Sequence, residues 1–209
     1  MKLGVHDDLS LFTEQKMSYL KQLGVTNIIA KKGGVAGQTE EQITQLVSEF
    51  CQGDYWRIEN LAAAKKWVES CGLEVSGIAR EVPNKVILGL PGRDEQIENW
   101  CKSLRSMGKV GIPLLRYGAW TINAGAWLSS WRTTAGTVGR GGAKYASFDY
   151  EVAKKTPVSE FGEISDEQCW DSLTYFLKAV IPVAEESDVK MVLHPADPQV
   201  PRLAGIARI

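Results

Sequence analysis

His194 is the residue of this sequence best suited to bind a metal ion. It follows the apolar run at 189–193, which is typical of a buried strand, and it begins the sequence His-Pro-Ala-Asp-Pro. The two prolines restrict the backbone, and a rigid setting suits a histidine ligand whose ring must keep one orientation. Asp197 adds a carboxylate nearby. This pattern predicts metal-assisted chemistry at the carboxyl end of a strand, where parallel α/β folds place their sites.

Ionisable or hydrogen-bonding residues also follow four other apolar runs. They are His6-Asp7-Asp8, Lys31-Lys32, Arg80-Glu81 and Arg116-Tyr117. In a parallel barrel all strand ends share one rim, so these side chains would surround one site. Polar residues are also expected wherever a strand leaves the core for water, and for any single strand end we prefer that plainer explanation. His194 is the exception, because of its rigid surroundings.

The segments between these residues predict alternating strands and helices. A helical pattern repeatedly ends near a glycine, and an apolar run typical of a strand covered on both faces then follows. We expect strands at 2–6, 25–30, 73–78, 112–116 and 189–193. Apolar residues at helical spacing predict helices over 17–23, 43–50, 61–71, 94–108 and 170–184. This alternation indicates a parallel sheet of βα units.

Three local features refine the predicted helices and loops. Ser165 and Gln168 have the spacing of a capping box at the start of the last helix. Asp94 is expected as the N-cap of the helix over 94–108. The long connection at 117–163 contains three tryptophans, and we expect it to act as a lid.

Composition favours a protein that acts on a small molecule. A chain of 209 residues with 44% hydrophobic residues can bury the core of one domain. The net charge of -1 and pI of about 6.2 predict no attraction to nucleic acid or to an anionic membrane. We find neither a signal peptide nor a run near the roughly 20 apolar residues of a membrane span. Four cysteines without a C-x-x-C pair argue against a zinc knuckle and fit a reducing, cytoplasmic location.

Five motifs spread along the chain resemble those of one enzyme family. They occupy 88–99, 131–134, 139–143, 191–198 and 205–209. Their order resembles that of the mannonate dehydratases, which are xylose-isomerase-like (β/α)8 barrels. The resemblance implies an α/β fold of the TIM-barrel type, with only about five βα units in one incomplete domain over 1–209. It also implies a lyase of glucuronate catabolism that dehydrates D-mannonate to 2-dehydro-3-deoxy-D-gluconate with Mn²⁺, or another divalent metal such as Fe²⁺.

The resemblance implies roles for particular residues. His194 maps onto the histidine of the family's metal-binding His-Pro-Asp-Asp-Pro motif. Arg132 lies in a motif similar to Trp-Thr-Arg-Thr and would face the anionic substrate, where its fork suits a carboxylate. Glu81, Tyr117 and Asp197, near the ends of strands, are expected as further contacts to a small sugar acid.

Two departures from the family pattern leave alternatives open. Ala196 replaces the second acid of His-Pro-Asp-Asp-Pro, and Tyr-Gly-Ala-Trp-Thr at 117–121 stands where the family has Tyr-Asn-Phe-Met-Pro. Family members also continue past the motif that ends at Ile209, and the general acid and base and the remaining metal ligands are expected there. The alternatives are a sugar isomerase or epimerase of the same barrel group, and a catalytically incomplete fragment. Open sheet edges would favour self-association, so a homo-oligomer is also expected.

Overall fold

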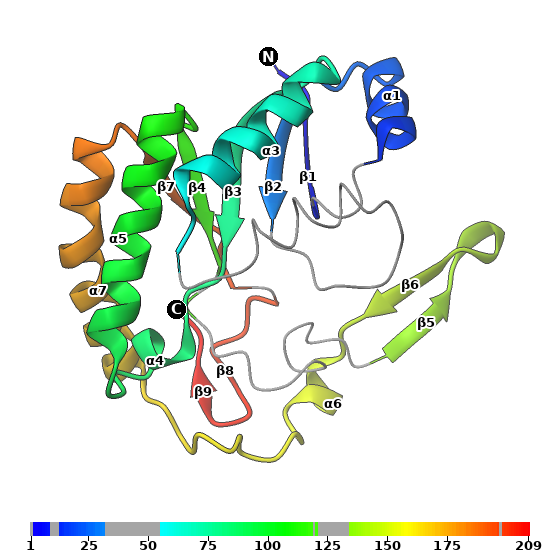
Figure 1. The fold of residues 1–209 in the computed structure, drawn as a ribbon. Helices are drawn as coiled ribbons and strands as arrows, with labels where there is room; N and C mark the ends of the chain where they lie inside the picture. The colour runs from blue at the N-terminus through cyan, green and yellow to red at the C-terminus, as the bar shows by residue number, and fades with distance from the viewer. Residues whose placement is uncertain (1, 9–12, 32–54, 119, 121–133, 197) are drawn as a thin grey trace. The chain divides into compact units, whose positions relative to one another are not determined.

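The computed structural model describes residues 2–8, 13–31, 55–118, 120, 134–196 and 198–209 (Figure 1). The elements are β1 (Gly4–Asp8), α1 (Glu14–Gln22), β2 (Asn27–Lys31), α3 (Ile58–Ser70), β3 (Glu74–Arg80), α4 (Asn84–Ile87), α5 (Arg93–Val110), β4 (Leu114–Tyr117), β5 (Thr134–Val138), η2 (Arg140–Gly142), β6 (Lys144–Ser147), α6 (Tyr150–Ala153), α7 (Asp166–Glu186), β7 (Lys190–Leu193), β8 (Arg202–Leu203) and β9 (Ile206–Ala207). All five predicted strands are present, and four of the predicted helices correspond to α1, α3, α5 and α7. The predicted helix over 43–50 lies outside the described residues.

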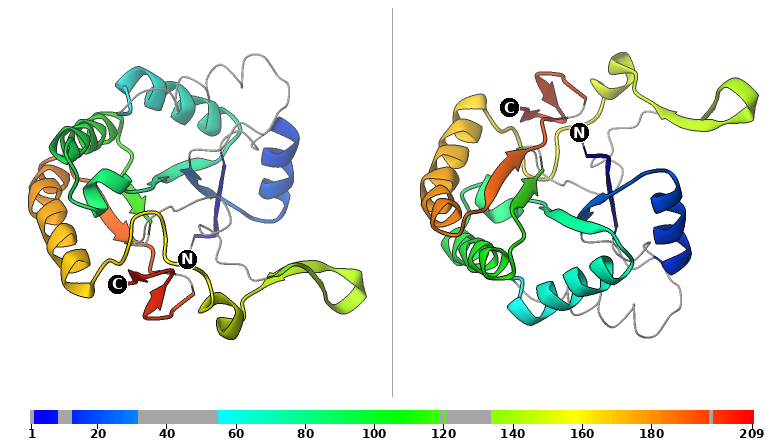
Figure 2. Two further views of the ribbon diagram at one scale, coloured as in Figure 1. Left: turned by 90° about the horizontal axis from the view of Figure 1, so that it is seen from below. Right: turned by 90° about the horizontal axis from the view of Figure 1, so that it is seen from above.

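One parallel sheet contains the five predicted strands in their chain order, β1-β2-β3-β4-β7. A doubly wound sheet instead reverses its strand order at a switch point and carries helices on both faces. Figure 2 shows α1, α3 and α5 following one another around the same side of the sheet. Sequential order with helices on one side is the arrangement of a barrel wall. The predicted fold class, an incomplete barrel of βα units, is therefore confirmed.

Alternation of side chains gives this sheet two distinct faces. Ala30, Val75 and Ile78 lie against α3, where they line a narrow apolar space with Leu61 and Val68. Successive side chains of a strand point to opposite faces, and the register shift between Ile28 and Ile29 brings both Val75 and Ile78 to the same face. The face away from the helices, here called the inner face, therefore carries Ile29, Lys31, Ala79 and Arg116, as the strand pairing requires. The face with Ala30, Val75 and Ile78 is called the outer face.

Capping chemistry explains where two of the helices begin. The Thr13 hydroxyl accepts a hydrogen bond from the Lys16 amide at 3.2 Å and so caps α1. The predicted capping box of α7 is confirmed. The Gln168 amide donates to Ser165 Oγ at 3.2 Å, and the Ser165 amide donates to Gln168 Oε1 at 2.8 Å.

The N-terminus of α5 differs from the prediction. The helix begins at Arg93, so Asp94 lies in its first turn and is not the N-cap. A carboxylate in the first turn is still favoured by the partial positive charge of the helix N-terminus. The acid therefore marks the beginning of the helix without fixing its first residue.

The chain divides into two compact units. One comprises 1–81, 94–117 and 177–193 and contains the parallel sheet, and the other comprises 82–93, 118–176 and 194–209. In the second unit β5 and β6 form one antiparallel hairpin and β8 and β9 form another. The segment at 117–163, expected to be irregular, thus contains β5, β6 and α6. Its action as a lid and the single-domain organisation stay predictions.

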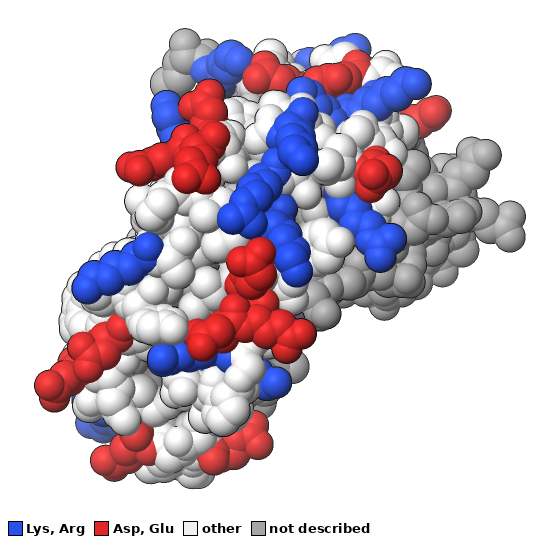
Figure 3. Space-filling model, turned by 60° about the vertical axis from the view of Figure 1, so that its left-hand side comes forward, with Lys and Arg blue, Asp and Glu red and all other residues white. Residues whose placement is uncertain are grey.

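The surface carries charges of both signs. Figure 3 shows Lys and Arg side chains on the same face as Asp and Glu side chains. This mixture agrees with the net charge of -1. No helix within the described ranges has the length and apolar character needed to cross a membrane.

Candidate active site at the carboxyl ends of the strands

The carboxyl ends of the first four strands meet at one edge of the sheet. Asp8 pairs with Lys31 at the ends of β1 and β2, and Arg80 pairs with Tyr117 at the ends of β3 and β4. Glu81 is the next residue after β3. The register therefore brings these ends together, as expected for the rim of a barrel.

An ion pair between Glu81 and Arg116 lies at this edge. Arg116 Nη1 is 3.3 Å from Glu81 Oε1, and the two side chains are 17% and 60% exposed. A partly exposed pair of this kind adds little to stability. The guanidinium has five donors in a planar fork, so it can hold Glu81 and still bind a second carboxylate. Arg116 is thus a cation on the inner face that could bind an anionic ligand.

Tyr117 has the opposite orientation from the one expected of a substrate contact. It is 6% exposed, and its register with Arg80 places it on the outer face with Ile78 and Leu115. Burial raises the pKa of its phenol. Adjacent residues of a strand point to opposite faces. Arg116, and not Tyr117, is therefore the residue of this pair on the face of Glu81. Because residues two apart in a strand share a face, Tyr117 lies on the same face as the buried Leu115.

Arg80 also points away from the predicted rim. Its guanidinium carbon lies 5.3 Å from the centroid of the Trp56 ring and 4.9 Å from that of Trp100, and its Nη1 donates to Ser103 Oγ at 2.7 Å. Cation–π contacts and a charged hydrogen bond hold the end of β3 against α5. Arg80 is therefore a structural brace that holds the backbone next to Glu81. Sequence reasoning missed this cluster, since Trp56 lies far from Trp100 in the chain.

His194 follows β7 directly and belongs to the second compact unit. Its ring is exposed, and Nδ1 lies 2.9 Å from the carbonyl oxygen of Pro195. When Nδ1 donates its proton to this carbonyl, the lone pair of Nε2 is free for a metal, which is the usual arrangement of a metal-bound histidine. His194 therefore fits the role of one ligand. In the part of the chain that the structure describes, no three His, Cys, Asp or Glu side chains come together as a metal site.

Two of the predicted site residues, Arg132 and Asp197, lie outside the described residues. Their roles as substrate contacts stay predictions. Of the two predicted contacts that the structure describes, Glu81 and Tyr117, it is Glu81 that lies at the strand ends on the inner face.

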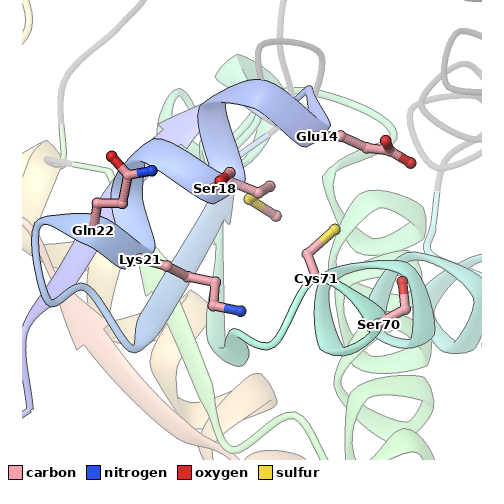
Figure 4. A pocket seen from close by; sticks show the side chains of 7 residues that line it. Glu14, Ser18, Lys21, Gln22, Ser70 and Cys71 are labelled. Carbon is pink, nitrogen blue, oxygen red and sulfur yellow. The ribbon is translucent and has the colours of Figure 1, made fainter.

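A separate cavity of about 540 Å³ lies between α1 and the end of α3. Figure 4 shows Glu14, Ser18 and Lys21 of α1 near Ser70 and Cys71. The residues at 70 and 71 end α3 shortly before β3 begins, so this cavity is near the amino ends of the strands. In a barrel that end serves stability and not catalysis. The cavity is therefore not part of the candidate active site.

Comparison with known proteins identifies one family along the chain. The family model described as D-mannonate dehydratase (UxuA) matches residues 13–158 and 149–209. The mannonate dehydratase of Brachyspira hyodysenteriae is 30% identical over 190 residues, which are 75% of this chain and 52% of that protein. The mannonate dehydratase of Streptococcus pneumoniae is 34% identical over 187 residues, 80% of this chain and 51% of that protein. The chain spans about half the length of these curated relatives.

Solved structures agree with the observed topology. The crystal structure of mannonate dehydratase from Streptococcus suis serotype 2 covers 100% of this chain with a TM-score of 0.77 and 27% identity, and the chain covers 57% of it. D-Psicose 3-epimerase from Clostridium cellulolyticum H10 covers 93% with a TM-score of 0.51 and 13% identity, and the chain covers 52% of it. The second likeness, at that low identity, concerns the fold alone.

Proposed function

The chain belongs to the D-mannonate dehydratase family, and on that basis we propose that the protein removes water from D-mannonate to give 2-dehydro-3-deoxy-D-gluconate. The observation that carries this proposal is the family match along nearly the whole chain. The strand ends of the parallel sheet support it, because they place an arginine and a carboxylate on one rim. A place in glucuronate catabolism, a cytoplasmic location and a homo-oligomeric state belong to the same proposal.

The residues of the chain are proposed to bind and orient the sugar acid. The free donors of Arg116 would hold the substrate carboxylate, and Glu81 would accept hydrogen bonds from substrate hydroxyls. The Glu81–Arg116 contact limits the motion of both side chains before the substrate arrives. Arg132, Tyr117 and Asp197 remain predicted substrate contacts, although burial of Tyr117 gives it no direct support.

A divalent metal, Mn²⁺ or Fe²⁺, is proposed to be held in part by His194 through Nε2. When bound, such a cation stabilises the negative charge that develops as the proton next to the substrate carboxylate is removed. The hydrogen bond at Nδ1 keeps the His194 ring in the tautomer that a metal requires. We propose that the general acid and base lie in the half of the relatives that this chain does not match.

The test compares the 209-residue chain with a version extended to the length of the relatives. Both are incubated with D-mannonate and Mn²⁺, and the product is identified chemically. We expect the extended protein to form a keto-deoxy acid. An aldose or ketose product would instead indicate an isomerase or epimerase, and no product from the extended protein would refute the dehydratase proposal. If the extended protein is active and the 209-residue chain is not, the result would support the alternative that the shorter chain is a catalytically incomplete fragment.

The same assay tests His194 against the second histidine of the chain. We expect His194→Gln to weaken Mn²⁺ binding and activity by at least about 10-fold, in the range found for altered metal sites. His6→Gln is the comparison, because it removes the second imidazole of the chain from β1, and we expect it to lower the Mn²⁺ affinity less than His194→Gln does. Equal Mn²⁺ affinity in both variants would remove His194 from the metal site.

A further inference from the structure

Lys31 and Arg116 lie in one row across the inner face of the sheet. In the strand pairing Lys31 is opposite Ala79, and Ala79 is opposite Arg116. Residues directly opposite one another in neighbouring strands have side chains on the same face, and two strand spacings put the backbones of the two cations about 10 Å apart. β2, β3 and β4 run in the same direction in Figure 1. The row therefore places two cations at the carboxyl ends of the strands with only a methyl group between them.

An apolar layer lies one step closer to the amino ends of the strands. Ile29, two residues before Lys31, pairs with Gly77. A Cβ atom on Gly77 would lie 2.7 Å from the carbonyl oxygen of Leu114 and 2.8 Å from its Cδ2 atom. The Leu114 side chain thus occupies the space that glycine leaves. An anion that enters from the carboxyl ends would therefore meet the two cations above a floor formed by Ile29 and Leu114.

The register distinguishes Lys31 from an ordinary polar residue at a strand end. Polar side chains are expected wherever a strand leaves the core, but Lys31 shares its row and its face with Arg116. Glu81 lies 3.3 Å from Arg116 and offsets its charge. In the part of the chain that the structure describes, the exposed Lys31 side chain has no ion pair or hydrogen bond. Of these three side chains, Lys31 therefore supplies the positive charge that is left for a ligand.

We propose that Lys31 determines specificity for a sugar acid by binding the substrate carboxylate together with Arg116. This inference rests on the proposed function, which supplies the ligand. Both side chains are long, and Ala79 has no atom beyond Cβ between them, so the ammonium and the guanidinium can meet at one carboxylate. The positive charge that remains beside the Glu81–Arg116 pair matches a ligand with a single carboxylate. A neutral aldose or ketose, the substrate of a sugar isomerase, would leave Lys31 without a counter-charge.

A stable substrate analogue and its amide test this role by equilibrium binding. 3-Deoxy-D-mannonate keeps the carboxylate but lacks the hydroxyl that would leave, so no dehydration occurs during the measurement. 3-Deoxy-D-mannonamide has nearly the same shape and no charge. Both are titrated by calorimetry into the Mn²⁺-loaded protein extended to the length of the relatives. The difference between the two ligands reports the interaction of each protein variant with the negative charge.

Neutral replacement of Lys31 should weaken binding of the acid selectively. We expect Lys31→Met to raise the dissociation constant of the acid at least about 10-fold, because a charge-assisted hydrogen bond is lost. The dissociation constant of the amide should stay within about 3-fold of the wild-type value. Lys31→Arg keeps the charge and should retain most of the affinity for the acid. Lys66→Met, at an exposed lysine of α3, is the matched control and should bind both ligands as the wild type does.

Three results would overturn the proposal. They are a folded wild-type protein that does not bind the acid, a Lys31→Met variant that binds it as the wild type does, and an equal loss of affinity for acid and amide. The last result would show a structural role. If circular dichroism shows that Lys31→Met does not fold, Lys31→Gln takes its place.

The outcome for Lys31 is separable from that for the dehydratase. A protein that binds the acid through Lys31 but forms no keto-deoxy acid from D-mannonate would support the role of Lys31 and refute the dehydratase proposal. A protein that forms the keto-deoxy acid but binds the analogue equally well with Lys31→Met would do the reverse.

Discussion

Replacement of Gly108 by alanine tests how closely α5 approaches the chain after α7. Gly108 lies in the last turn of α5. A Cβ atom at this position would overlap the carbonyl oxygen of Ser187 and would lie 3.0 Å from Ser187 Cβ and 3.2 Å from its carbonyl carbon. The nearest atom belongs to the backbone, so no side-chain rotation can relieve the contact. The helix and Ser187 would have to separate.

Two effects of opposite sign determine the expected change in stability. Alanine is favoured over glycine in a helix by about 1 kcal/mol. Overpacking a close contact costs about 1 to 3 kcal/mol, and a backbone neighbour puts this site in the upper part of that range. We therefore expect Gly108→Ala to lower the free energy of unfolding by about 1 to 2 kcal/mol. For a chain of this size the melting temperature falls by roughly 2–4 °C for each kcal/mol.

Urea unfolding followed by circular dichroism measures this change, and two further variants isolate its cause. Ala62→Gly, at an exposed site of α3, should lose about 1 kcal/mol through helix propensity alone. Adding Ser187→Gly to Gly108→Ala removes the contact with Cβ but keeps the overlap with the carbonyl oxygen. We expect it to recover only part of the stability. An increase in stability on Gly108→Ala would refute the close approach, because helix propensity would then be the dominant effect.

Three further predictions concern stability and reactivity. Ser165→Ala should cost about 1 kcal/mol in urea unfolding, because the α7 capping box is lost, and an unchanged midpoint would contradict it. Arg80→Met should lower the free energy of unfolding by about 2 to 4 kcal/mol, since a charged hydrogen bond and two cation–π contacts are removed. Arg105→Met, at an exposed arginine, is its control and should change the free energy of unfolding by less than about 1 kcal/mol. Burial raises the pKa of the Cys101 and Cys169 thiols, so the folded state holds these protons more tightly than the unfolded state. The two thiols should therefore add to the free energy of unfolding below the ordinary thiol pKa of about 8.5, and this contribution should decline as the pH rises above that value. Replacing both cysteines by alanine should flatten the decline of stability with pH. A pH profile of stability that is unchanged by the replacement would contradict this prediction.

Local sequence patterns predicted most of the secondary structure. β1 lies near the start of the chain, β2, β3 and β4 follow helices that end near a glycine, and β7 follows a helix that ends near Asp188, which has a positive φ like those glycines. Such boundaries depend on residues close together in sequence. The capping box of α7 is equally local and was predicted correctly. Asp94 was assigned wrongly as an N-cap, because an acid is favourable at several positions of a first turn. Local signals therefore identify elements better than they locate their ends.

The candidate site was harder to predict, because it depends on which face of a strand each residue occupies. Glu81 and Tyr117 are both predicted from their places near strand ends, but the structure has Glu81 beside Arg116 on the inner face and Tyr117 buried on the outer face, and their roles as substrate contacts stay predictions. A shift of one residue moves a side chain to the other face of the sheet. Arg116 and Glu81 are 35 residues apart in the chain, and it is the pairing of β3 with β4 that brings them together. The sequence around either residue does not show this pairing.

The sequence by itself determined the alternating βα elements, the family motifs and the position of His194 after its strand, since all of these depend on neighbouring residues. Only the tertiary structure decided that Arg116 pairs with Glu81, that Arg80 stacks on two tryptophans, and that Gly108 lies against the backbone of Ser187. The physical reason is that these arrangements join residues far apart in the chain. Their contacts arise from strand register and helix packing, which periodicity alone does not specify.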